Sequence, residues 1–152
     1  MNWDLIFSLT NAVAMLGWVM LAVLPRKPLV LSAVLYFGVG LLCLTYFLLF
    51  VASIGGLLDP NRLPGTLEPN LLDYSIAGLR PLFLSDGGIV IGWTHYLAFD
   101  LFVGLWIARD ADAKSVGRLV QLPFLFATLM AGPIGLLAWL AFRGLRSRPG
   151  NG

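Results

Sequence analysis

The chain has 152 residues, of which 59% are hydrophobic and only 12% charged, with a mean hydropathy of +0.86. Soluble domains are about 45–50% apolar and about 25% charged, so this composition excludes an ordinary soluble domain and indicates a membrane protein. The net charge of +2 is small and the basic residues form no stripe, which argues against a nucleic-acid-binding protein.

Four apolar stretches, each near the ~20 residues that cross a ~30 Å hydrocarbon core, predict four transmembrane helices. The expected spans are residues 5–24, 29–54, 88–108 and 119–142, with one long loop over residues 55–87. The first stretch lacks the basic flank of a signal peptide, so we expect it to remain as a helix. The chain is therefore predicted to be an all-α polytopic membrane protein, a single-domain bundle of four transmembrane helices with both termini on one side.

The long loop contains a short apolar pattern. Leu71, Leu72, Ile76 and Leu79 recur at near-helical spacing, with charged residues between them. This spacing predicts a short helix from Leu71 to Leu79. Such a helix either lies on the membrane surface or caps the bundle, and the pattern does not decide between the two.

The basic residues do not orient a four-span bundle. Positive charge is enriched in cytoplasmic connections, but here it is evenly divided between the two sides. One side would carry Arg26, Lys27, Arg109, Lys114 and Arg118, and the other Arg62, Arg80, Arg143, Arg146 and Arg148.

Asp100 is the one formally charged residue near the middle of a predicted helix. A carboxylate at that depth costs roughly 2.5–3.5 kcal/mol, so it must face the bundle interior or a wet cavity and needs a partner. It is either an acid/base or ligand-orienting group, which we favour, or a structural hydrogen-bonding group between helices. Asn11 in the first helix is a candidate partner because a carboxamide donates to a carboxylate. A carbonyl freed by Pro133 in the fourth helix is the other.

His95 is the only histidine. It precedes Asp100 on the same helix by ~140° of rotation, so the two side chains reach one ligand only across a wide cavity. Its alternative role is that of an ordinary buried or interfacial histidine. One histidine, one buried aspartate and Cys43 on another helix form no recognisable ligand set, so neither a metal nor a cofactor is predicted.

Aromatic residues run along the whole third predicted helix. They form either the wall of a site for a long apolar ligand or an ordinary surface for helix packing and lipid contact. These residues are Trp93, Tyr96, Phe99, Phe102 and Trp106. In the fourth helix, the sequence of residues 132–135, Gly-Pro-Ile-Gly, predicts a kink that opens a pocket or lets two helices pack closely.

Three stretches resemble the abscisic-acid-deficient-four-like membrane family, known from a plant plastid protein needed to form the carotenoid neoxanthin. They are residues 11–18 (NAVAMLGW), 92–110 (GWTHYLAFDLFVGLWIARD) and 132–137 (GPIGLL). Together with their spacing they cover nearly the whole chain. The resemblance implies a carotenoid or related isoprenoid lipid as ligand, and it maps the family's residues of interest onto His95, Asp100, Arg109 and Asp110.

Our leading hypothesis is a small protein of a bacterial plasma membrane that binds a carotenoid-like lipid and isomerises it without a cofactor. Asp100 and His95 would be the catalytic acid and base. The ligand-binding residues would be Asn11, Trp18, Trp93, Tyr96, Phe99, Phe102, Trp106, Arg109 and Asp110. The alternatives are a non-catalytic scaffold for pigment or lipid enzymes, and a small oligomeric channel or transporter. Membrane lipids are the expected surroundings, nucleic acid is not an expected partner, and homo-oligomerisation is left open.

Overall fold

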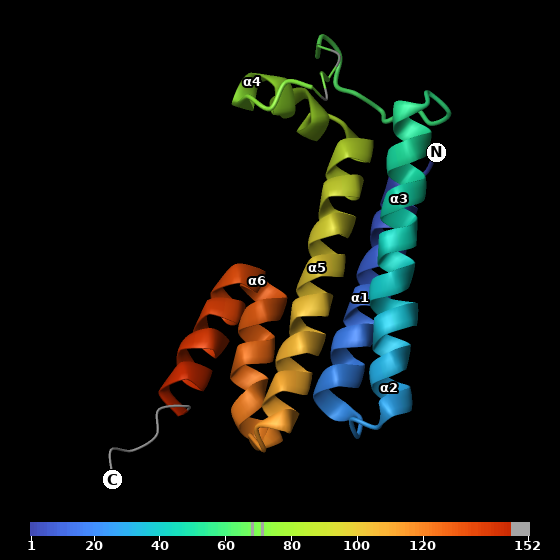
Figure 1. The fold of residues 1–152 in the computed structure, drawn as a ribbon. Coiled ribbons are helices and arrows are strands. Elements are labelled where there is room, and N and C mark those ends of the chain that lie inside the picture. The colour runs from blue at the N-terminus through green and yellow to red at the C-terminus, as the bar shows by residue number, and fades with distance from the viewer. Residues whose placement is uncertain (68, 71, 147–152) are drawn as a thin grey trace.

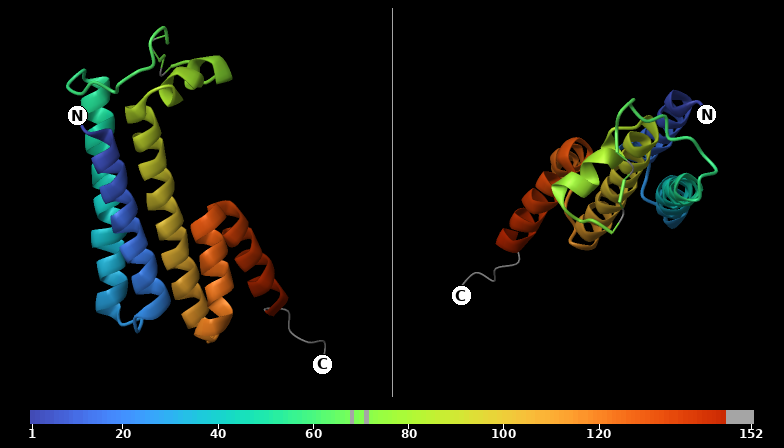
Figure 2. Two further views of the ribbon diagram at one scale, coloured as in Figure 1. Left: turned by 180° about the vertical axis from the view of Figure 1, so that it is seen from behind. Right: turned by 90° about the horizontal axis from the view of Figure 1, so that it is seen from above.

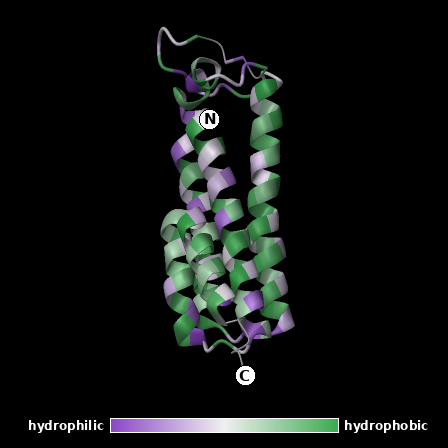
Figure 3. Cartoon of the chain, turned by 60° about the vertical axis from the view of Figure 1, so that its left-hand side comes forward, coloured by the Kyte–Doolittle hydropathy of each residue, from purple (hydrophilic) through white to green (hydrophobic). Residues whose placement is uncertain are grey.

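A computed structural model describes residues 1–67, 69–70 and 72–146, and these residues form helices and loops without a β-strand. Four helices are long and apolar enough to cross a membrane, which confirms the predicted all-α membrane bundle (Figure 1). Hydrophobic residues dominate these helices. Hydrophilic residues lie mainly at the ends and in the long loop, and a few lie partway along the bundle (Figure 3).

The first two apolar stretches form an antiparallel pair. Helix α1 (Trp3–Val23) begins at Asn2, whose side chain accepts a hydrogen bond from the Leu5 backbone N–H at 3.0 Å. The second rod consists of α2 (Pro28–Ala33), the π-helix η1 (Val34–Gly40) and α3 (Leu41–Ile54). Pro28 suits the first turn of this rod because its missing N–H has no helical acceptor there.

The long loop carries two short helical turns, α4 (Ile76–Leu79) and the 3₁₀-helix η2 (Arg80–Phe83). Ser75 begins α4 by accepting from the Gly78 N–H at 3.2 Å. A helix had been expected to start at Leu71, which lies outside the described residues; the described helix starts at Ile76. These turns project sideways above α5 (Figure 1).

Helix α5 (Asp86–Ala113) is the centre of the bundle and contacts α1, α3 and α6 (Figure 2). Glycines let its neighbours approach closely. A Cβ atom added at Gly17 or at Gly38 would come within 2.7 Å or 2.9 Å of the buried Leu101 side chain. Gly104 leaves room in the same way for the Trp18 ring. Close contact of this kind is how helices associate within a membrane.

The last helix, α6 (Arg118–Arg146), reverses its direction at Ala131, whose backbone is not helical (φ −158°, ψ 76°). In a straight helix Phe124 and Phe142 would lie about 27 Å apart. Their ring centroids are 5.1 Å apart, so the chain folds back on itself. We call residues 118–130 the first arm and residues 132–146 the second arm of this hairpin, which Figures 1 and 2 show as two short helices side by side.

The residues around the reversal explain why the chain turns here. Pro133 cannot donate the hydrogen bond that would continue the first arm, but it fits the first turn of a new helix. Gly135 lies against the backbone of Thr128 in the opposite arm, where a Cβ atom would have no space. A sequence of this type had been expected to kink the helix; instead it closes a tight hairpin.

The N-terminus and the last described turn of α6 therefore lie at opposite ends of the bundle, which contradicts the expectation that the chain begins and ends on one side. The second arm returns to the end where α6 began: Arg143 Nε lies 3.5 Å from Asp110 Oδ2, near the end of α5. Trp3, in contrast, donates to the Asp59 carbonyl in the long loop at 3.1 Å. Each arm rises only about 20–22 Å, which is short of a ~30 Å core.

Candidate functional site

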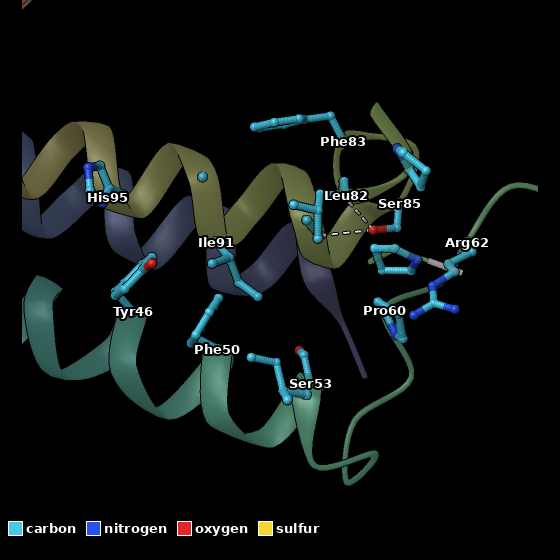
Figure 4. A pocket seen from close by; sticks show the side chains of 15 residues that line it. Tyr46, Phe50, Ser53, Pro60, Arg62, Leu82, Phe83, Ser85, Ile91 and His95 are labelled. Atoms are coloured by element: carbon cyan, nitrogen blue, oxygen red, sulfur yellow. Dashed lines mark hydrogen bonds between the residues drawn. The ribbon is translucent and has the colours of Figure 1, made fainter. Parts of the chain in front are cut away.

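A largely apolar pocket of about 500 Å³ opens between α3 and α5, beneath the long loop. Figure 4 shows side chains from both helices and from the loop converging on it. Its volume lies within the range of ~300–1,000 Å³ that is usual for small-molecule sites. The lining residues are Tyr46, Phe50, Ser53, Ile54, Pro60, Arg62, Pro69, Pro81, Leu82, Phe83, Ser85, Gly88, Ile91, Gly92 and His95.

Stacked rings form the end of this pocket that is farther from the long loop. Tyr46 and Phe50 are one turn apart on α3, and their ring centroids lie 5.6 Å from each other. His95 of α5 meets the Tyr46 ring edge-on at 5.5 Å and stacks on Phe99 at 4.6 Å. The imidazole is therefore held between two helices with its ring orientation set by aromatic neighbours.

Polar groups gather at the other, loop-facing end (Figure 4). Ser85 Oγ donates to the Leu82 carbonyl at 3.2 Å and accepts from the Gly88 N–H at 3.1 Å, which begins α5. The backbone of Arg62 pairs with that of Ser85 in an isolated bridge, so this basic residue is held at the pocket. Ser53 Oγ on α3 is buried and makes no hydrogen bond with any described residue.

The start of α5 fixes the loop that covers the pocket. Gly87 N–H donates to the Pro60 carbonyl at 2.9 Å, and Leu63 N–H donates to the Leu84 carbonyl at 3.1 Å. The Asn61 side chain also donates to the Asp86 carboxylate. Backbone hydrogen bonds of this kind keep the polar end of the pocket assembled without a regular sheet.

Asp100 faces away from this pocket, toward α6. Only 7% of its surface is exposed, and its carboxylate interacts with the backbone of Gly132 at the start of the second arm. A methyl group added at Gly132 would overlap that carboxylate. His95 lines the pocket and Asp100 does not, so the structure does not bring the expected acid–base pair to one cavity.

Asn11 does not contact Asp100. Its amide nitrogen donates to the Phe7 carbonyl at 2.7 Å, and its oxygen accepts from Trp93 Nε1 at 3.1 Å. Asn11 was thus the wrong partner for Asp100, because it meets α5 at Trp93, about 10 Å along the helix before Asp100. Asp100 does contact the region near Pro133, as expected, but the group that it meets there is the Gly132 backbone N–H and not a freed carbonyl.

The other predicted ligand-binding residues fall into separate environments. Trp18 packs in the core, and Tyr96 donates to the Met130 carbonyl at 3.3 Å. Phe99 and Phe102 are exposed on α5. At the far end of the bundle, the guanidinium of Arg143 lies 5.5 Å from the Trp106 ring, Asp110 pairs with Lys114, and Arg109 is exposed. Of the expected set, the pocket itself includes only His95, with Phe99 directly beneath it.

Sequence reasoning missed the α3 and loop residues of the pocket. Tyr46 and Phe50 are four positions apart, which signals a shared helix face, but many apolar residues of that helix show the same spacing. Nothing in the pattern of Ser53 or Arg62 indicates that the loop folds over α3. That placement follows from the hydrogen bonds between the loop and the start of α5.

The family model of the ABA DEFICIENT 4-like proteins matches residues 5–139. This chain belongs to the ABA DEFICIENT 4-like family. The match confirms the resemblance and links the chain to carotenoid-related membrane proteins. Neither the curated proteins nor the solved structures contain a match to it.

Proposed function

We propose that this protein binds a carotenoid or a related isoprenoid lipid, with one end of the ligand in the pocket between α3 and α5. The observation that carries the proposal is the pocket itself: largely apolar and aromatic along its length, with Ser53, Arg62 and Ser85 gathered at the loop-facing end. A lipid with an apolar chain and a polar end group fits such a gradient.

The dimensions of the site support this orientation. From Ser85 to His95 the pocket follows α5 for about 15 Å, which is half of a ~30 Å hydrocarbon core. A polyene chain would continue past His95 along the exposed rings of Phe99 and Phe102. The end group would lie near Ser53 and Arg62 at the membrane interface, and membrane lipid would cover the remaining side.

The positions of His95 and Asp100, the expected catalytic pair, support ligand binding more strongly than catalysis. Only His95 faces the ligand, beside the Tyr46 ring, while Asp100 is engaged by the hairpin. If the ligand is isomerised, His95 is the residue we expect to exchange the proton. The engagement of Asp100 in a helix contact also favours a second candidate function, a non-catalytic membrane scaffold for lipid or pigment enzymes. We expect a bacterial plasma membrane as the location in both cases.

The test uses two substitutions of the same residue type on α5. Ile91 lines the pocket, whereas Ile89 is exposed and does not. Ile91→Trp fills part of the pocket and should remove most co-purifying isoprenoid lipid, while Ile89→Trp should retain it. The measurement is the absorption spectrum and mass spectrum of lipid extracted from each purified variant.

Equal amounts of bound lipid in both variants would refute the pocket as the binding site. Chemistry is tested separately, by comparing the mass and absorption spectrum of a defined carotenoid before and after incubation with wild type and with His95→Phe. Conversion by wild type alone supports an isomerase. Binding without conversion in both supports the scaffold.

A further inference from the structure

The hairpin of α6 meets α5 at Asp100, and this contact leaves one carboxylate oxygen unused. Oδ1 lies against Gly132. Oδ2 is buried and makes no hydrogen bond with any described residue, because the neighbouring Tyr96 hydroxyl donates to the Met130 carbonyl instead. A buried polar atom without a partner is costly, and a carboxylate near the middle of a membrane helix more so.

No basic side chain of the described residues neutralises Asp100. Two basic residues of α6 have described side chains, Arg118 and Arg143, and both lie at the end of the bundle. Arg118 donates to the Leu24 carbonyl, and Arg143 pairs with the Asp110 carboxylate. His95 is on the face of α5 that meets α3. Tyr96, one turn before Asp100 on the same face, is the titratable side chain that interacts with it.

Other oxygen atoms lie at the same contact between α5 and the hairpin. The break at Ala131 ends the first arm, and the last carbonyl groups of a helix have no helical donors. One of them, the Met130 carbonyl, accepts from the Tyr96 hydroxyl at 3.3 Å. Discontinuous helices inside membranes use carboxylates and freed carbonyl groups in this way to bind small cations.

We propose that Asp100, together with Tyr96 and the carbonyl groups freed at the break in α6, binds one small monovalent cation, a proton or Na⁺. A single carboxylate balances a single positive charge. Among the described residues no group of three or more His, Cys, Asp or Glu side chains is assembled, which disfavours a divalent ion or a transition metal at this position. The site is separate from the lipid pocket on the other face of α5.

Cation binding neutralises Asp100 and holds the tip of the hairpin against α5. A ligand that binds only the folded state raises its stability in proportion to occupancy. The thermal stability of the purified wild-type protein should therefore increase with the concentration of the cation. For Na⁺ the increase appears when sodium chloride replaces choline chloride at constant ionic strength. For a proton, the increase in thermal stability appears when the pH is lowered and does not depend on the sodium concentration.

Two variants and one control make the experiment specific to this site. Asp100→Asn keeps the shape of the side chain but removes its charge. If the cation is Na⁺, the Tm of this variant should no longer respond to sodium; if it is a proton, the Tm should lose the wild-type response to pH. Tyr96→Phe retains Asp100 and should weaken the response. Asp4→Asn removes an exposed carboxylate at the far end of α1 and should respond as wild type does.

An infrared spectrum identifies a bound proton independently. A protonated carboxyl band present in wild type and in Asp4→Asn, but missing in Asp100→Asn, indicates a proton-binding site. Wild-type stability that responds to neither sodium nor pH would overturn the proposal. The same response in Asp100→Asn as in wild type would overturn it as well. If Asp100→Asn does not fold, the responses of wild type and Tyr96→Phe still decide.

Discussion

Gly132 has no space for a side chain, because the Asp100 carboxylate occupies the place of its Cβ atom. Gly132→Ala should therefore push the second arm away from α5 and lower the free energy of unfolding by about 1–3 kcal/mol, the usual cost of overpacking. Gly144→Ala is the matched control, since a Cβ atom at Gly144 has no neighbour within 4 Å. The measurement is thermal unfolding in detergent, and equal stability of the two variants would contradict the described contact.

The sequence identified Asp100 as an unusual residue but did not identify its partner. Asp100 was singled out because a charge in an apolar helix needs a partner, and it is indeed buried. Its partner depends on where α6 reverses, which hydropathy does not reveal. Asn11 was chosen for its hydrogen-bonding chemistry, but its position on α1 directs it to Trp93 instead.

At the scale of the elements, Arg26 joins three helix ends. Only 6% of its side chain is exposed, and it donates to Asp112 at 2.8 Å, to the Ala108 carbonyl at 3.2 Å and to Gln121. Burial lowers the pKa of its guanidinium, and the charge of Asp112 opposes this effect. These contacts connect the loop after α1 to the end of α5 and the start of α6.

Arg26→Met should lower the free energy of unfolding by about 1–3 kcal/mol, because it removes the buried ion pair with Asp112 and leaves the Gln121 side-chain oxygen without its donor. Lys27→Met removes the neighbouring exposed charge and should change stability by less than about 0.5 kcal/mol. Chemical or thermal unfolding of the two variants provides the comparison. A larger effect at Lys27 than at Arg26 would show that the three helix ends are held together by other contacts.

At the scale of the whole molecule, the hairpin changes the charge balance between the two ends of the bundle. Because the second arm returns, Arg143 joins the short connections, while only Arg62 and Arg80 remain in the long loop. The described basic residues at the end of the short connections are Arg26, Lys27, Arg109, Lys114, Arg118 and Arg143. By the positive-inside rule, we expect this end to face the cytoplasm.

Reporter fusions should therefore place the C-terminus in the cytoplasm and the N-terminus on the opposite side. A straight fourth span would put both termini on the same side. Cysteine labelling at the long loop is the control, because it should react from the side of the N-terminus in either topology. Two termini on one side would refute the hairpin as the state in the membrane.

Hydropathy and charge placement determined the fold class, because a ~30 Å apolar core requires long stretches of apolar residues whatever their tertiary contacts. They also identified Asp100 and His95 as unusual, since each is a rare polar residue in an apolar helix. The sequence of residues 132–135 predicted a break in the last helix, but only tertiary contacts decided that the chain reverses there, since residues 118–145 are long and apolar enough to cross the membrane as one helix. The pocket was decided in the same way, because it needs the loop to be fixed to the start of α5 by hydrogen bonds between residues distant in the chain. The hydropathy pattern along the sequence specifies which residues are buried in the membrane. The packing of helix faces against each other determines which polar groups come into contact.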